Sequence, residues 1–170
     1  MQSDPSRVAD TKAWLAKATQ DLRRVEILFA ANPPDVEGAL FHSQQAAEKA
    51  LKAFLTRHDV PFRRVHELDV IGGQCVDVDP TLADLVNRVD ALTKYAWRFR
   101  YPGAPYEPTF EEGRVSSTLA KEAMDAIGCH HGPAAGRSEA VAQCGFRCDQ
   151  SAAAPVRVPS RDVVWGFATR

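Results

Sequence analysis

Long stretches of this chain keep apolar residues at three- and four-residue spacing, and this helical period constrains the fold more than any other feature. Residues 8–31 form the first such stretch, which Pro33 ends because proline cannot continue a helix. Its apolar positions are Leu15, Ala18, Leu22, Val25 and Phe29. No segment alternates apolar and polar residues as a central strand would. We therefore expect an all-α protein.

The stretch "FHSQQAAEKALKAFL", residues 41–55, has no glycine or proline and predicts a second helix, which Asp35 can cap. At roughly 100° per residue, its polar residues share one sector and its apolar residues share the opposite one. The polar sector holds His42, Gln45, Lys49 and Lys52, with Glu48 at its edge. A solvated outer face would explain this pattern, and so would a shared pocket or an interface.

Three further helices follow from the same signals. "HELDVIGG" predicts a short helix that the glycine pair closes, and Asp79 with Pro80 predicts the start of a long helix that stops before Pro102. A last helix is expected over residues 109–127, with Gly128 placed to terminate it.

Long helices joined by short connections can bury their apolar stripes only against their neighbours. We therefore expect an antiparallel up-and-down four-helix bundle with one short extra helix, spanning residues 8–127. A chain of 170 residues with 45% hydrophobic residues is sufficient for one such core. Residues 128–170 mix glycine, proline, alanine and serine without a period, which is typical of an irregular or disordered tail.

Composition sets limits on the partners. Lysine and arginine number 21 against 22 acidic residues, a net charge of -1, so no global field draws the chain to nucleic acid or to a membrane surface. The N-terminus lacks a signal-peptide pattern, and no apolar run is long enough to span a membrane, so we expect a cytoplasmic protein without membrane contact.

The cysteines predict free thiols, since disulfides are rare in the cytoplasm. A zinc site is a further possibility that the spacing does not favour, because it matches no standard ligand pattern. The side chains concerned are Cys129, His130, His131, Cys144 and Cys148. We expect no metal and no cofactor.

The segment "YAWRFRYPG", residues 95–103, places Arg98, Arg100 and Tyr101 where the fourth helix ends. Arginines there can simply stabilise the negative end of the helix dipole, or they can bind phosphate while aromatic rings stack on a base. If the short helix reverses the chain direction, the second and fourth helices run parallel, and these residues join one basic pocket near the end of the second helix. Its other members would be Lys49, Lys52, Arg63, Arg64 and His66.

Other catalytic schemes have no support in the sequence. "IGGQC" lacks the spacing and the preceding strand of a phosphate-binding loop, and Ser116 and Ser117 have no histidine nearby in sequence. Glu111 and Glu112 are explained by the dipole at the start of the last helix.

The combination of "FHSQQAAEKALKAFLTRHDVPFRRVHEL" with "YAWRFRYPG" resembles the HEPN family, named for higher eukaryotes and prokaryotes nucleotide-binding. The resemblance covers about residues 8–127. It implies a helical bundle that forms a homodimer and pairs with a minimal nucleotidyltransferase, often as toxin and antitoxin. The positions that match the family pattern, with Arg98 beside them as a ligand candidate, are His42, Gln45, Glu48, Lys49, Lys52, His66, Arg98, Arg100, Tyr101 and Pro102.

Many HEPN proteins are metal-independent ribonucleases, in which four to six residues separate an arginine from the histidine that follows it. No histidine of this chain has an arginine at that offset; after Arg98 and Arg100 the positions read "GAP" and "PYE". We therefore expect no catalytic residue and a binding or regulatory subunit that can hold a nucleotide or RNA. Two alternatives stay open: a degenerate ribonuclease in which Tyr106 or His66 replaces the missing histidine, and a purely structural interaction module.

Overall fold

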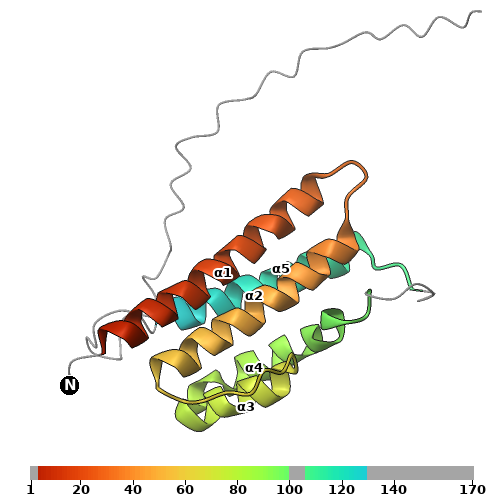
Figure 1. Ribbon diagram of the computed structural model, residues 1–170. Helices are drawn as coiled ribbons and strands as arrows, with labels where there is room; N and C mark the ends of the chain where they lie inside the picture. The colour runs from red at the N-terminus through yellow and green to blue at the C-terminus, as the bar shows by residue number, and fades with distance from the viewer. Residues whose placement is uncertain (1–3, 100–105, 130–170) are drawn as a thin grey trace, which may run out of the picture. The chain divides into compact units, whose positions relative to one another are not determined.

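The computed structural model describes residues 4–99 and 106–129, and its regular elements in that part of the chain are all helical. In chain order they are α1 (Pro5–Ala30), α2 (Val36–Arg57), α3 (Leu68–Val78), the 3₁₀ turn η1 (Pro80–Leu82), α4 (Ala83–Val89), the 3₁₀ segment η2 (Asp90–Ala96) and α5 (Phe110–Cys129). Figure 1 shows α1, α2 and α5 as long helices lying alongside one another, with α3 and α4 as a shorter pair beside α2. The predicted all-α bundle is confirmed.

Short polar side chains begin the first two helices. Asp4 accepts a hydrogen bond from the Ser6 amide at 3.0 Å, and Pro5 occupies the first turn of α1. Asp35 accepts from the Gly38 amide at 2.9 Å and caps α2 as the sequence predicts.

The central element of the bundle is α2, which packs most extensively against α1 and α5 and also touches α3 and η2. Its fully buried apolar side chains include Leu40, Leu51, Phe54 and Leu55. Burying a side chain of this size stabilises a fold by about 1.5–3 kcal/mol. Because neighbours surround α2 on several sides, part of its polar sector is also enclosed, and Glu48 and Lys52 are both buried.

The sequence predicted that the glycine pair ends the short helix, and this prediction is wrong. Instead, α3 continues through Gly72 and Gly73 to Val78. Neither glycine has the positive φ of a helix-ending residue. Gly72 instead lets α3 approach α4 closely, since a Cβ added there would lie 2.4 Å from Val86 Cγ1. Gly128 likewise lies inside α5, which ends at Cys129.

The predicted long fourth helix is also wrong, because the chain forms η1, α4 and η2 in succession. Asp79 does cap the start of η1, by accepting from the Thr81 amide. Farther along, the Thr93 hydroxyl donates to Asp90 and accepts from the Leu68 amide at 3.0 Å, which ties η2 to the start of α3. The spacing of apolar residues along the sequence does not reveal a tertiary contact of this kind, so the break in the helix could not be predicted from it.

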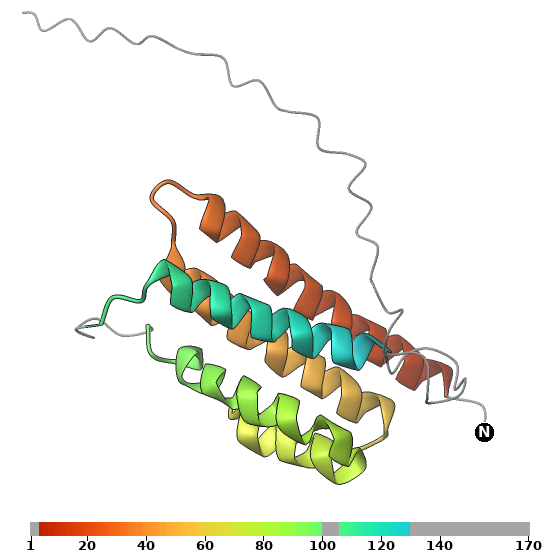
Figure 2. The ribbon, with the colours of Figure 1, turned by 180° about the vertical axis from the view of Figure 1, so that it is seen from behind.

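The chain reverses in residues 58–67, before α3 begins. Figures 1 and 2 show this segment returning along the bundle, so that α4 and η2 run antiparallel to α2. Accordingly, Tyr95 and Phe99 lie beside Gly38 and Phe41 of α2, where they line a shallow hollow of about 310 Å³. The condition for a parallel arrangement of the second and fourth helices is therefore not met.

The described helices include none that is both long enough and apolar enough to cross a bilayer. Most of the expected tail, residues 130–170, lies outside the described residues, as do Arg100, Tyr101 and Pro102. The division of the chain near residue 128 stays a prediction.

We predict that Gly72→Ala destabilises the protein by about 1–3 kcal/mol, because overpacking against Val86 forces α3 and α4 apart. Gly73→Ala is the matched control, since a Cβ there meets nothing within 4 Å. It should stabilise the helix by about 0.5–1 kcal/mol. Urea unfolding of both variants measures the difference, and equal effects would contradict the close packing of α3 on α4.

Candidate functional site

A buried carboxylate on α1 gathers the first group of polar side chains. Asp21 accepts from Arg24 Nη1 at 2.7 Å, lies 3.0 Å from His42 Nδ1 and pairs closely with the Lys49 ammonium. Burial raises the pKa of Asp21, but the hydrogen bonds and charges of these donors outweigh it and hold the pKa below its ordinary value. We call Asp21, Arg24, His42 and Lys49 the Asp21 cluster.

A second carboxylate, Glu48, belongs to α2 itself and gathers another group of polar side chains. Glu48 Oε1 accepts from Lys52 Nζ at 2.7 Å, while Oε2 accepts from Gln44 at 3.0 Å and lies 3.0 Å from His66 Nδ1. Burial raises the pKa of Glu48, but these hydrogen bonds again outweigh it and leave the pKa lowered. We call Gln44, Glu48, Lys52 and His66 the Glu48 cluster.

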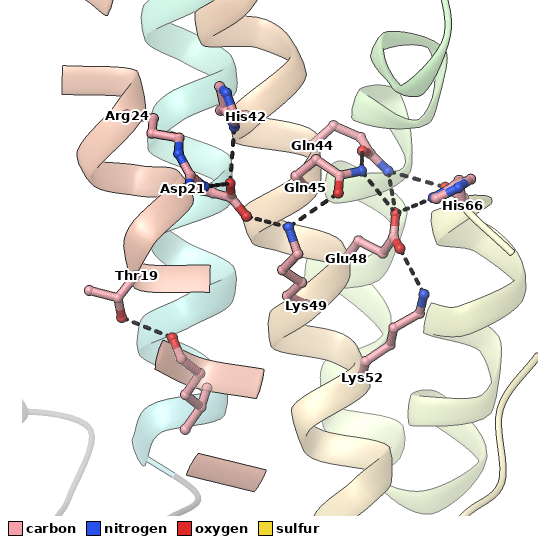
Figure 3. A network of polar contacts seen from close by, with 11 residues as sticks. Thr19, Asp21, Arg24, His42, Gln44, Gln45, Glu48, Lys49, Lys52 and His66 are labelled. Carbon is pink, nitrogen blue, oxygen red and sulfur yellow. Dashed lines mark hydrogen bonds and ion pairs between the residues drawn. The ribbon is translucent and has the colours of Figure 1, made fainter. Parts of the chain in front are cut away.

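Gln45 joins the two clusters. Its amide nitrogen donates to Gln44 Oε1 at 2.8 Å, and its oxygen accepts from Lys49 Nζ at 3.2 Å. Figure 3 shows the resulting chain of polar contacts, which runs from α1 across α2 to the segment before α3. Polar groups linked in this way rigidify one another, because each satisfies a partner that would otherwise be buried unpaired.

The Glu48 cluster also fixes the backbone of that segment. Lys52 Nζ donates to the carbonyl of Val65 at 3.2 Å, and Gln44 donates to the carbonyl of His66 at the same distance. The position of the His66 ring is thus set by α2 through both its backbone and its side chain.

The two clusters expose nitrogen donors and enclose negative charge. The side chains of Asp21 and Glu48 are only 3% and 5% exposed. Those of His42 and Lys49 are 23% and 20% exposed, and those of His66 and Arg24 reach 41% and 51%. A surface that presents N–H groups and cations in this way is suited to an anion such as phosphate.

Arg98 lies in a different group, at the end of η2. Its guanidinium sits 4.2 Å from the centre of the Tyr106 ring. The hydroxyls of Tyr106 and Tyr95 both donate to Glu112 of α5, and Lys94 Nζ lies 3.7 Å from the same carboxylate. These contacts tie together the two described chain ends at Phe99 and Tyr106.

The pKa directions in this group follow from the shared carboxylate. Burial raises the pKa of Glu112, but the two tyrosine hydrogen bonds and the nearby cations outweigh burial, so that the pKa lies below its ordinary value. The pKa of Tyr106 is raised chiefly by its hydrogen bond to Glu112, and that of Tyr95 is raised by burial and by the same bond. Both phenols therefore remain protonated donors at neutral pH.

The structure brings six of the sequence-predicted site residues into one network: His42, Gln45, Glu48, Lys49, Lys52 and His66. Arg98 is linked to them only indirectly, since its neighbour Trp97 packs edge-on against the His66 ring at 5.9 Å. Two members of the conditional basic pocket do not meet: Lys52 is buried on Glu48, and the Arg98 guanidinium lies over Tyr106. Two further members, Arg100 and Tyr101, lie outside the described residues.

Sequence reasoning missed Asp21, Gln44 and the tyrosine contacts of Glu112. Asp21 did carry a signal, because it follows Ala18 by three residues and precedes Val25 by four, which places a carboxylate on the buried stripe of α1. Gln44 and Glu112 carried none. Within the described ranges, no group of three or more histidine, cysteine or acidic side chains is arranged to hold a metal ion.

Comparisons with known proteins place this geometry in context. Residues 11–129 match the family model described as HEPN domain. A protein of Methanocaldococcus jannaschii named "Putative toxin MJ1304" is 28% identical over 123 residues, covering 66% of this chain and 74% of that protein. No solved structure matches the chain.

We predict that Asp21→Asn destabilises the fold by about 2–3 kcal/mol, because the neutral amide leaves Lys49 without its anion in a partly buried position. Asp10→Asn is the control, since Asp10 is an exposed residue of the same helix. Its effect should stay within about 0.5 kcal/mol. Chemical denaturation at neutral pH compares the two variants.

The same substitution should also change how the free energy of unfolding depends on pH. Because the pKa values of Asp21 and Glu48 are lowered on folding, their stabilisation is fully present above the unfolded-state values near 4 and is lost as the pH falls through the folded-state values. The wild type should therefore lose stability below about pH 4, and Asp21→Asn should lose less. An acid dependence that is identical in both proteins would contradict a charged Asp21 in the fold.

Proposed function

The chain belongs to the HEPN domain family, and from that premise we propose that it is a binding and regulatory subunit of a toxin–antitoxin pair. Its similarity to a protein whose name describes a toxin supports a role of this type. The partner that we propose is a minimal nucleotidyltransferase, as the family resemblance implies.

The ligand that we propose for this subunit carries a phosphate group, as a nucleotide or as RNA. One observation carries this proposal: the Asp21 and Glu48 clusters enclose their carboxylates and expose Arg24, His42, Lys49 and His66. Since Arg24 and Lys49 are cations and each imidazole becomes a second donor when it is protonated, the surface complements an anion although the net charge of the chain is -1.

A degenerate ribonuclease is the second candidate, and one contact favours it. The His66 ring is tied through Nδ1 to a buried carboxylate, which is how a general base is commonly oriented. Tyr106 is less suited, because its hydroxyl donates to Glu112 and its pKa is raised. RNA cleavage without metal that is lost in His66→Gln would establish this activity.

We propose homodimerisation through the end of the bundle where η2 meets α2. Trp97 is 39% exposed there, and Phe41 and Phe99 line the neighbouring hollow. Aromatic side chains in such positions are common anchors of protein interfaces.

We predict that nucleotides or short RNAs raise the melting temperature of the protein. A ligand that binds only the folded state adds about 2.7 kcal/mol at a free concentration one hundred times Kd. Arg24→Gln should reduce this rise, because it removes an exposed donor and leaves the pair of Asp21 with Lys49 in place. Arg23→Gln, on the same helix and exposed, is the control.

Two outcomes separate the alternatives. No rise with any nucleotide or RNA would contradict phosphate binding and favour a structural interaction module, for which co-purification with a nucleotidyltransferase is the next test. A rise that Arg24→Gln and Arg23→Gln change equally would place the ligand elsewhere.

For the dimer, Trp97→Ala should shift the equilibrium toward monomer in light scattering at graded protein concentrations. Val115→Ala removes an exposed apolar side chain from α5 and should leave the mass unchanged. A wild type that is monomeric at every concentration would contradict the dimer.

A further inference from the structure

The contact of His66 with Glu48 fixes which ring nitrogen carries the proton. The low pKa of Glu48 keeps it ionised at neutral pH, and a carboxylate can only accept hydrogen bonds. His66 Nδ1, 3.0 Å from Glu48 Oε2, must therefore be the donor. In the neutral imidazole the other nitrogen, Nε2, then carries a lone pair and no hydrogen.

This tautomer decides what His66 can bind. A lone pair on Nε2 repels an anionic oxygen, so the neutral ring is a poor contact for phosphate. After protonation both ring nitrogens are donors, and Nε2–H can form a charge-assisted hydrogen bond to phosphate while Nδ1–H stays on Glu48. Since the side chain is 41% exposed, a ligand can reach it without displacing the cluster.

The charges around the two histidines distinguish them. Asp21 already contacts Lys49 and Arg24, so a proton on His42 would add a third positive charge to one carboxylate. Among the described residues, Glu48 pairs with one lysine or arginine, Lys52. A positive charge added at His66 therefore has one neighbouring cation fewer than a positive charge added at His42.

Charged and polar groups from each neighbouring element surround the His66 ring and affect the energy of a proton on it. From α2 come Glu48 and Lys52, and within the segment itself the Glu67 carboxylate accepts the His66 amide at 3.1 Å. Exposed Arg63 and Arg64 precede His66 in the same segment. From η2 comes the neutral Trp97 ring, whereas the Arg98 guanidinium that follows lies over Tyr106.

We infer that His66 is a proton-gated contact of the phosphate site: Glu48 holds Nδ1–H, and the ligand binds through Nε2–H only after the ring takes up a proton. Glu48 is thus a positioning residue, and binding of a phosphodiester strengthens as the pH falls from about 8 to about 6. This inference rests on the proposed phosphate-binding function.

The test uses the full chain and a uridine hexanucleotide with hydroxyl ends. This probe has no terminal phosphate, so its own charge is constant between about pH 8 and about pH 6. At fixed salt, its affinity for the wild type should rise by more than about tenfold over that interval, because a ligand that binds only the protonated ring follows the protonated fraction of an imidazole. Calorimetry in two buffers of different ionisation enthalpy measures the proton uptake directly.

Two histidine variants test whether His66 is the residue that takes up the proton when the ligand binds. His66→Gln should abolish the pH dependence, whereas His58→Gln, which changes an exposed histidine at the end of α2, should retain it. Glu48→Gln should raise affinity at pH 8, because an amide N–H at Nδ1 moves the ring proton to Nε2. Nitrogen NMR of the wild type reads the tautomer of His66 and does not depend on the folding of any variant.

The outcomes separate this inference from the function on which it rests. Binding that is equal at both pH values, a pH dependence that survives in His66→Gln, or a neutral ring protonated on Nε2 would overturn the proton gate and leave phosphate binding in place. No binding of the probe at either pH would overturn both.

Discussion

A carboxylate enclosed between packed helices is stable only while donors reach it, and α2 of this bundle contains one such group, Glu48, and contacts another, Asp21 of α1. Glu48 draws Lys52, Gln44 and the His66 ring to itself, and Asp21 draws side chains from α1 and α2. Leaving either carboxylate unpaired would cost several kcal/mol. The neighbours of α2 must therefore lie where these donors can be supplied.

The Glu48 cluster fixes the path of the chain between α2 and α3 as well as the geometry of the site. By donating to the carbonyls of Val65 and His66, Lys52 and Gln44 hold the segment before α3 against the middle of α2. The chain has consequently already returned along α2 when α3 begins, which makes α4 and η2 antiparallel to α2. Trp97 accordingly lies beside His66, while the guanidinium of the next residue, Arg98, lies over Tyr106.

The helices and the segment that pack against α2 decide which of its polar side chains are enclosed and which are exposed. On an isolated helix it would be a solvated face, but here its acid is enclosed and its bases reach the surface. Paired, partly buried side chains of this kind are held in fixed positions, which an anion-binding surface needs and a flexible lysine does not provide. That difference is why we favour a binding subunit over an inert scaffold for this HEPN family member.

The sequence by itself determined the all-α class, the caps at Asp35 and Asp79, the limits of α1 and α2 to within a few residues, and five of the α2 residues that form the network. Those five are His42, Gln45, Glu48, Lys49 and Lys52. These features depend on local chemistry, namely the apolar period, the helix-breaking prolines and the capping side chains. Only the tertiary structure decided that α3 continues through Gly72, that the fourth helix divides into 3₁₀ and α segments, and that Asp21 and His66 complete two clusters on either side of α2. Each of these depends on a partner distant in sequence, Val86, Leu68 or Glu48 among them, and the period of one helix holds no information about which helix packs against it.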